Sequence, residues 1–345
     1  MLATLALLAS LSTNPITDKD TFPIGVWLQS PAQAERYKAA AFNLYVGLWQ
    51  GPTEEQLAAL TKARMPVVCD QNEVGLKHKS DPIIAAWMHG DEPDNAQPVT
   101  GSDGKPGWGP CIPPAKIVED YKRLKANDPG RQVLLNLGQG VANDSWIGRG
   151  SGAKLSDYET YVQGCDIVSF DVYPVASLGQ PSQIGLVAKG LDRLQGWTAG
   201  KKRIWAVLEC TAIDGKMKPT PAQVRAEAWS ALIHGATGLI YFVHQFAPSF
   251  NEHALLDDPT MLPSVTELNK QIQSLAPVLL SKPLEGYQSD NAKVHVAARK
   301  SKGSLYVFAV SLSDEAQEAT FGPTKMKESF KPYEAKVIRL SVVSR

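Results

Sequence analysis

Eight short runs rich in β-branched and aromatic residues alternate with helical stretches from Phe22 onward. This alternation is typical of repeated βα units, which build parallel sheets. Several of the runs are continuously apolar, as expected for strands that are buried on both faces. The runs are Phe22–Gln29, Phe42–Trp49, Met65–Gln71, Ile83–Gly90, Gln132–Gly138, Asp166–Tyr173, Arg203–Glu209 and Gly238–His244. Eight such strands close naturally into a TIM barrel, whereas open doubly wound sheets more often have about five or six. The sequence therefore predicts an α/β fold, a (β/α)8 barrel.

Helical segments are predicted between these strands, and only the third strand lacks a clear helix behind it. The predicted helices are Pro31–Ala40, Glu54–Arg64, Pro114–Ala126, Ser156–Gln163, Gln183–Trp197, Pro221–His234 and Met261–Leu275. Two of them begin with a capping signal, in which Thr53 and Thr220 precede the first helical turn.

Three regions are expected along the chain: residues 1–20 as a leader, residues 21–280 as the barrel and residues 281–345 as a small antiparallel, β-sandwich-like domain. The run Met1–Ser12 is apolar and ends in small residues, which is typical of a signal-peptide core, although no basic residue precedes it. The sequence therefore predicts a secreted or periplasmic protein. Beyond residue 281, β-type segments alternate with turns rich in Gly, Ser, Asp and Lys.

The charge balance excludes some classes of partner. Lys and Arg number 35 and Asp and Glu number 35, so the chain has no net field with which to attract nucleic acid or an anionic membrane. A neutral partner such as a carbohydrate fits better, and the eight Trp residues could stack on sugar rings or simply fill the core. Neither a dinucleotide-binding nor a P-loop motif occurs, and no cofactor is predicted. The four cysteines show no metal-ligand spacing; a Cys69–Cys111 disulfide and free buried thiols both fit them.

Two glutamates occupy the expected ends of opposite strands. Glu92 follows the fourth strand in a turn that Pro93 stops, and Glu209 ends the apolar seventh strand. The carboxyl ends of the strands form the active-site face of such barrels. A surface-loop acid for Glu92 and an Arg-paired structural acid for Glu209 are the alternatives. Glycosidic bond cleavage needs two facing carboxyl groups, one that donates a proton and one that attacks the anomeric carbon. Their placement therefore predicts an O-glycosyl hydrolase.

On these residues the chain resembles clan A of the glycoside hydrolases over about Phe22 to Phe246. The resemblance implies retention of anomeric configuration and cleavage of a β-linked glycoside or oligosaccharide, with Glu92 as acid/base and Glu209 as nucleophile. The stretches Asp171–Pro174 and His234–Phe242 look like β-galactosidase-type members, in which a tyrosine orients the nucleophile. Tyr173 is the matching residue here, and the same stretches bring Asp171 and Tyr241 into the expected substrate site.

Asp91 departs from the family pattern, because clan A enzymes usually have Asn before the acid/base. An ionised Asp can only accept a hydrogen bond, and its charge would raise the proton affinity of Glu92. Asp91 could therefore assist Glu92, take over the proton transfer or mark an unusual substrate.

Other polar and aromatic residues at strand ends are expected to line the barrel mouth or to lie in the core. They are Trp27, Gln29, Trp49, Gln50, Asp70, Asn72, Asn136, Gln139, His244 and Gln245. Tryptophan would supply a stacking surface and the amides would bind hydroxyl groups. The loop Gly101–Pro113 carries Trp108, which would wall the cleft or lie in a solvated loop.

Two rival functions follow from the same fold. A metal-dependent hydrolase would want His-x-His after the first strand, where the chain has Gly25-Val26-Trp27. A non-catalytic carbohydrate-binding barrel would keep the aromatic residues but need neither glutamate. The sequence does not indicate the oligomeric state.

Overall fold

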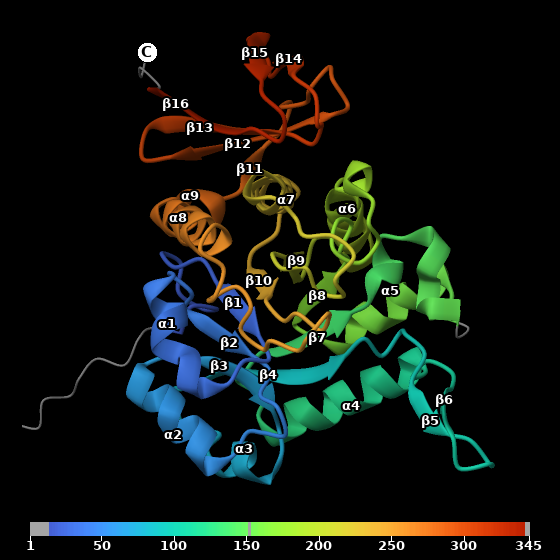
Figure 1. Ribbon diagram of the computed structural model, residues 1–345. Helices are drawn as coiled ribbons and strands as arrows, with labels where there is room; N and C mark the ends of the chain where they lie inside the picture. The colour runs from blue at the N-terminus through green and yellow to red at the C-terminus, as the bar shows by residue number, and fades with distance from the viewer. Residues whose placement is uncertain (1–13, 151–152, 342–345) are drawn as a thin grey trace, which may run out of the picture.

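The computed structural model describes residues 14–150 and 153–341, in which eight parallel strands close into a barrel surrounded by helices (Figure 1). The order around the barrel is β1-β10-β9-β8-β7-β4-β3-β2. The strands are β1 Ile24–Trp27, β2 Leu44–Val46, β3 Val67–Asp70, β4 Ile84–Asp91, β7 Val133–Leu137, β8 Ile167–Asp171, β9 Arg203–Glu209 and β10 Leu239–Phe242. Each coincides with one of the predicted runs, and only β4 extends one residue past its run. The predicted (β/α)8 barrel is confirmed.

The helices lie outside the strands, and seven of them match the predicted segments; two short helices, α3 behind the third strand and α9 after α8, were not predicted. The helices are α1 Ala34–Ala39, α2 Glu54–Ala63, α3 Glu73–Lys77, α4 Pro114–Asn127, α5 Tyr158–Tyr161, α6 Leu186–Thr198, α7 Pro221–Ile233, α8 Met261–Ser274 and α9 Ala276–Leu279. Short 3-10 turns are η1 Pro31–Gln33, η2 Gln139–Val141, η3 Asp144–Gly150, η4 Leu155–Asp157, η5 Val162–Gly164 and η6 Pro181–Gln183.

Both predicted capping signals form capping boxes. The Thr53 hydroxyl accepts a hydrogen bond from the backbone N–H of Gln56 at 3.2 Å, and the Gln56 side chain accepts one from the Thr53 N–H at 2.9 Å. Thr220 and Gln223 make the same pair at the start of α7. These bonds satisfy N–H groups that the first turn of a helix leaves without a partner.

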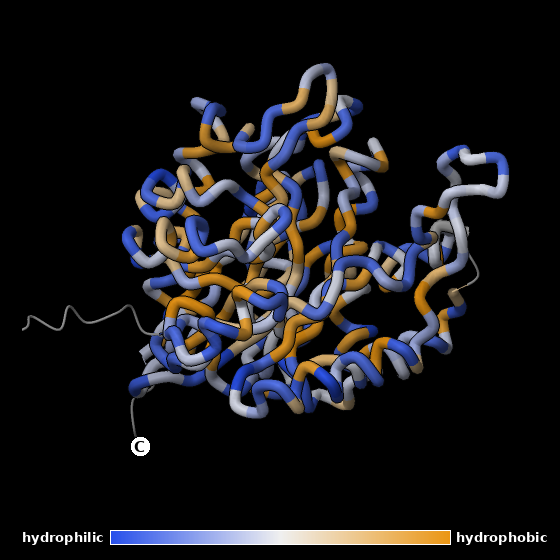
Figure 2. The backbone as a smooth tube through the Cα atoms, turned by 90° about the horizontal axis from the view of Figure 1, so that it is seen from below, coloured by the Kyte–Doolittle hydropathy of each residue, from blue (hydrophilic) through white to orange (hydrophobic). Residues whose placement is uncertain are grey.

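Side chains alternate between two cores along each strand, as the period of two requires. On β9, Trp205 and Val207 belong to the core inside the barrel, whereas Ile204, Ala206 and Leu208 pack outward against the helices. Figure 2 shows the hydrophobic segments running through the middle of the molecule, with most hydrophilic segments at its rim. The strand ends are therefore held rigidly from both sides.

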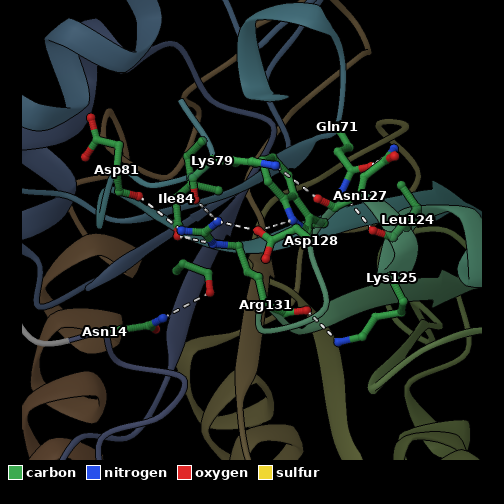
Figure 3. Close-up of polar contacts among 12 residues, drawn as sticks. Asn14, Gln71, Lys79, Asp81, Ile84, Leu124, Lys125, Asn127, Asp128 and Arg131 are labelled. Carbon is green, nitrogen blue, oxygen red and sulfur yellow. Dashed lines mark hydrogen bonds and ion pairs between the residues drawn. The ribbon is translucent and has the colours of Figure 1, made fainter. Parts of the chain in front are cut away.

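The N-terminal end of the barrel is covered by the first described residues. Met1–Ser12 lie outside the described residues, so the signal-peptide prediction stays a prediction. Residues 14–20, which fall within the predicted leader, pack against the barrel: Ile16 is fully buried and the Asn14 amide donates to the carbonyl of Ala85 at 3.0 Å (Figure 3).

Arg131 joins the N-terminal ends of β4 and β7 at this face (Figure 3). Its guanidinium contacts Asp128 Oδ2 at 2.6 Å and donates to the carbonyl of Ile84 at 2.8 Å. It also lies 5.2 Å from the centre of the Trp87 ring, whose indole N–H donates to Asp128 at 3.0 Å. Residues at this end of a TIM barrel generally serve stability. We therefore assign this polar cluster a structural role.

Replacing Arg131 with alanine is expected to lower the free energy of unfolding by about 2–4 kcal/mol, because Asp128 and the strand carbonyls lose a charged donor in a largely buried place. Burial would raise the pKa of Asp128, but Trp87 and Arg131 together hold that pKa below its ordinary value. A carboxyl group whose pKa is lowered by folding stabilises the folded state at pH values above its unfolded-state pKa. This stabilisation is lost as the pH falls through the folded-state pKa. Urea denaturation should therefore show the loss at pH 7 and a smaller one near pH 3. The exposed Lys116→Ala variant should leave the midpoint nearly unchanged.

A C-terminal β region packs on the outside of the barrel helices. Its strands are β11 Pro283–Leu284, β12 Val294–Ser301, β13 Ser304–Ser311, β14 Gln317–Phe321, β15 Met326–Phe330 and β16 Ala335–Ser341, in one four-stranded and one two-stranded antiparallel sheet. Phe308 of β13 stacks on Trp229 of α7 with ring centroids 5.6 Å apart. Figure 1 shows this region above α7 and α9.

A small hairpin, β5 Pro98–Thr100 and β6 Pro106–Trp108, lies in the region predicted as a Gly- and Pro-rich loop. It projects away from the barrel beyond α4 (Figure 1).

Candidate active site

A cavity of about 300 Å³ opens at the C-terminal ends of the strands and contains three carboxylates. We call it the carboxylate cavity. Its lining residues are Trp27, Asp91, Glu92, Asn136, Gln139, Asp171, Val172, Tyr173, Ser177, Leu178, Val207, Ile213, Phe242 and Phe246. The acids come from the ends of β4 and β8, the face that carries the chemistry in barrels of this type.

An irregularity in β4 brings Asp91 to the cavity. Met88 belongs to the core inside the barrel, and in a regular strand the residue three positions later would face the opposite side. The register between β4 and β7 shifts between Met88 and Gly90, so one extra residue is accommodated there. Asp91 consequently pairs with Asn136 of β7 and lines the same interior space.

Glu92 follows with its backbone in the left-handed region, at φ 44°. This conformation costs a residue with a side chain roughly 1–2 kcal/mol, and it persists only where surrounding structure enforces it. Its N–H donates to the carbonyl of Asn136 at 2.9 Å and its carbonyl accepts from Asn95 at 3.1 Å. The turn therefore holds Glu92 at a fixed position on the cavity wall.

Asn136 connects two of the acids. Its amide nitrogen donates to Asp91 Oδ1 at 2.9 Å and to Asp171 Oδ1 at 3.3 Å. The Ser169 hydroxyl donates to its amide oxygen at 2.7 Å, which fixes the orientation of the amide group. Because the same nitrogen donates both hydrogen bonds, the two carboxylate oxygens lie within roughly 6 Å of each other.

Tyr173 places a hydroxyl beside these carboxylates. Burial raises its pKa well above the ordinary value, and the charges of Asp171, Glu92, Asp91 and Glu209 raise it further. The hydroxyl therefore keeps its proton and can donate a hydrogen bond to a carboxylate or to a ligand oxygen. Its ring packs against Phe242, with centroids 5.3 Å apart.

Glu209 ends β9 but is fully buried and does not line the carboxylate cavity. Its Oε1 accepts from the backbone N–H of Val175 at 2.8 Å, and its Oε2 accepts from that of Ala176 at 2.6 Å. These bonds tie Glu209 to the loop after β8 that carries Tyr173. In this arrangement both of its oxygens are already engaged by the backbone.

Glu227 of α7 lies beside Glu209 and is itself fully buried. Within the described parts of the chain no donor reaches either of its oxygens. Burial and the Glu209 charge raise the pKa of Glu227 well above its ordinary value, so it holds a proton that it can donate to Glu209. Burial also raises the pKa of Glu209, against the lowering effect of Glu227 and the two backbone amides. This pair could not be predicted from the sequence, because Glu227 is an internal residue of a helix.

A second cavity of about 540 Å³ lies at the ends of β1 to β4, and we call it the tryptophan cavity. Its lining residues are Trp27, Leu28, Gly47, Leu48, Trp49, Gln50, Asp70, Gln71, Asn72, Met88, His89, Gly90, Asp91, Arg123 and Leu124. Trp27 and Asp91 line both cavities.

Most of the residues expected at the barrel mouth line one of the two cavities: Trp27, Asp91, Glu92, Asn136, Gln139, Asp171 and Tyr173 in the first, and Trp49, Gln50, Asp70 and Asn72 in the second. Trp108 and Gln29 line neither. The first cavity is also lined by residues that were not predicted, among them Phe242, Phe246, Ser177, Leu178 and Ile213, although the exposed Phe246 immediately follows the predicted Gln245.

The predicted residues on and after β10 lie elsewhere. Tyr241 is buried in the outer core, where its ring contacts Phe42 edge-on at 5.4 Å. His244 is buried beside Gln29, and burial lowers its pKa to about 4, so its ring is neutral at pH 7. Gln245 pairs through its backbone with Asn251. None of these three side chains lines the described cavities, although Phe242 and Phe246 of the same segment line the carboxylate cavity.

Other features of the described residues bear on the remaining expectations. All four cysteines are free thiols, with Cys69, Cys165 and Cys210 buried, so no Cys69–Cys111 disulfide is formed. Among residues 14–150 and 153–341, no three His, Cys, Asp or Glu side chains are grouped to hold a metal ion. No helix in these ranges is both long and apolar enough for a transmembrane span.

The same fold is found in solved α-amylase structures. An α-amylase from Anoxybacillus superposes with a TM-score of 0.54 at 9% identity over 95% of this chain and 99% of its own. One from Lactobacillus plantarum gives 0.54 at 12% identity, covering 95% and 100%. One from Geobacillus thermoleovorans, described in complex with acarbose, gives 0.50 at 12% identity, covering 93% and 98%. No protein-family model and no curated protein matches the sequence. At these identities the likeness establishes the fold.

Proposed function

We propose that the protein is a retaining glycoside hydrolase whose reaction takes place in the carboxylate cavity, with Glu92 as general acid and base. The observation that carries this proposal is the group of Asp91, Glu92 and Asp171 on one cavity wall, with Asn136 between the two aspartates. Retaining enzymes place their carboxyl groups about 5–5.5 Å apart, and inverting enzymes about 6.5–9.5 Å apart. The Asp91 and Asp171 oxygens lie within roughly 6 Å of each other, but the pair that would react is Glu92 and Asp171, so support for the retaining class comes from the family resemblance and the product anomer tests it.

The first step would break the glycosidic bond. A carboxylate oxygen attacks the anomeric carbon, the bond to the leaving oxygen breaks, and Glu92 gives its proton to that oxygen. In the second step Glu92 removes a proton from water, the water oxygen attacks the anomeric carbon, and the carboxylate is released. The Tyr173 hydroxyl and the Asn136 amide are placed to hold charge and orient the carboxylates during both steps.

Two acids compete for the nucleophile role. The family resemblance assigns it to Glu209, which would need the loop of Val175 and Ala176 to release its oxygens. Asp171 already lines the cavity and comes from a different strand than Glu92. The geometry therefore favours Asp171, with Glu209 as the residue that positions the loop carrying Tyr173.

The substrate linkage is a separate part of the proposal. The resemblance in the sequence favours β-linked glycosides, whereas the solved structures of like fold described above are α-amylases. A carboxylate cavity with aromatic walls serves either anomer, since the stereochemistry is set by the side from which the nucleophile attacks. We therefore propose a carbohydrate substrate, and the α or β configuration of its linkage is to be determined by experiment.

The test is a panel of α- and β-linked aryl glycosides and oligosaccharides, with the first-formed product anomer followed by NMR. We expect turnover of at least one member, with the product keeping the configuration of its substrate. Inverted product would contradict the retaining mechanism. Binding by calorimetry without turnover of any member would instead support a non-catalytic carbohydrate-binding barrel.

A further inference from the structure

We infer that the tryptophan cavity binds further units of a neutral oligosaccharide whose scissile bond lies in the carboxylate cavity. The inference rests on the proposed function, because the bond that is cut would be the one beside Glu92. It names the substrate class: a chain of sugars, as opposed to a single sugar on a small aglycone.

The two cavities are adjacent. Trp27 and Asp91 line both, so a ligand that spans these two residues would occupy both cavities. The second cavity is the larger, at about 540 Å³ against about 300 Å³. Together they are lined by residues on or after all eight barrel strands. A groove of this extent exceeds what one sugar unit would fill.

Trp49 gives the tryptophan cavity an aromatic wall. Its side chain is 68% exposed, although a large ring normally gains stability by burial. The loop that carries it is fixed, because the Gln56 side chain donates to the carbonyl of Trp49 at 3.0 Å while also capping α2. An exposed ring on a fixed loop beside a cavity is suited to stack on the apolar face of a sugar ring.

The charges indicate a neutral ligand. Asp70 and Asp91 line the tryptophan cavity, and Arg123 is the cation that lines it with them. Asp70 is exposed at the end of β3, so its carboxylate oxygens are open to hydrogen bonds from a ligand. With two carboxylates and one arginine, the cavity would repel the negative charges of an acidic polysaccharide. Carboxylate and amide oxygens, in contrast, readily accept hydrogen bonds from the hydroxyl groups of a neutral sugar.

The experiment compares chain lengths in the full-length protein. For the sugar that the panel shows to be cleaved, kcat/KM is measured on its tetrasaccharide and on its disaccharide, with cellotetraose and cellobiose as the β-linked pair and maltotetraose and maltose as the α-linked pair. We expect the wild type to prefer the tetrasaccharide. Trp49→Ala should lower that preference roughly three- to tenfold, the effect of losing one aromatic stacking contact, mainly through KM.

Trp108→Ala is the matched control, because Trp108 is equally exposed, at 72%, but lines neither cavity. It should keep the wild-type preference. If Trp49→Ala changes the ratio no more than Trp108→Ala, or if the wild type cleaves both lengths equally well, the inference is overturned while the hydrolase proposal stands. If no glycan in the panel is cleaved, the proposed function fails and this inference fails with it.

Discussion

Glu92→Gln is expected to lower kcat/KM for an alkyl glycoside or a natural oligosaccharide by about two to four orders of magnitude, the usual contribution of general acid catalysis. Glutamine keeps the size of the side chain and the strained turn but has no proton to give. The loss should be much smaller on a dinitrophenyl glycoside, because this leaving group departs without protonation. With that substrate the deglycosylation step becomes limiting, and added azide should restore rate by attacking in place of water.

Glu55→Gln is the control for this variant. Glu55 is an exposed glutamate in the first turn of α2 and lines neither cavity. It should retain wild-type rates on both substrates. Equal losses for Glu92→Gln on activated and unactivated glycosides, with no response to azide, would remove Glu92 from the acid/base role.

The second large effect concerns the nucleophile. A 2-deoxy-2-fluoro glycosyl fluoride of the cleaved sugar should trap the covalent intermediate, because fluoride leaves readily and the fluorine at carbon 2 slows hydrolysis of the ester. Mass spectrometry of the digested protein then identifies the labelled carboxylate. We expect the label on the peptide with Asp171, because Asp171 lines the cavity and Glu209 does not. Asp171→Asn should accumulate no label and lose at least about a thousandfold in kcat, as removal of a reacting group does.

Glu209→Gln separates positioning from chemistry. Glutamine has one oxygen and one NH2 group, so it can accept a hydrogen bond from only one of the Val175 and Ala176 backbone N–H groups. We therefore expect a loss of about 1–3 kcal/mol in the free energy of unfolding and a reduced kcat. The variant should nevertheless still be labelled at Asp171. A label on Glu209 in the wild-type protein would instead support the assignment made from the sequence, and would mean that the loop after β8 opens during catalysis.

The sequence predicted the barrel because its signal repeats: eight strand-like runs separated by helical segments admit few other arrangements. The strand ends were equally informative where the chain continues straight into the cavity, as at Trp27, Asp91 and Asp171. Strand-end position alone could not say which way a side chain finally points. Tyr241 lies on the outward face of β10, a fact that the neighbouring inward residues Ile240 and Phe242 could have indicated.

The parts that the sequence could not predict depend on contacts between distant segments. The burial of Glu209 results from a loop more than thirty residues earlier and from Glu227 on α7. The hairpin of β5 and β6 forms where Gly and Pro indicated an irregular loop, since a short backbone ladder needs no apolar pattern. Asn136 was selected as a sugar ligand, but the structure shows it as a bridge between two acids.

Helix α7 has a different neighbour on each of two faces. Glu227 meets Glu209 beneath the barrel mouth, and two residues later Trp229 stacks on Phe308 of the C-terminal sheet. Two faces of the same helical turn thus link the outer sheet, through Glu209, to the loop that presents Tyr173. The C-terminal region accordingly supports the active site from outside the barrel. Removing or displacing that sheet would change the position of the loop that presents Tyr173, although no residue of the sheet contacts a sugar.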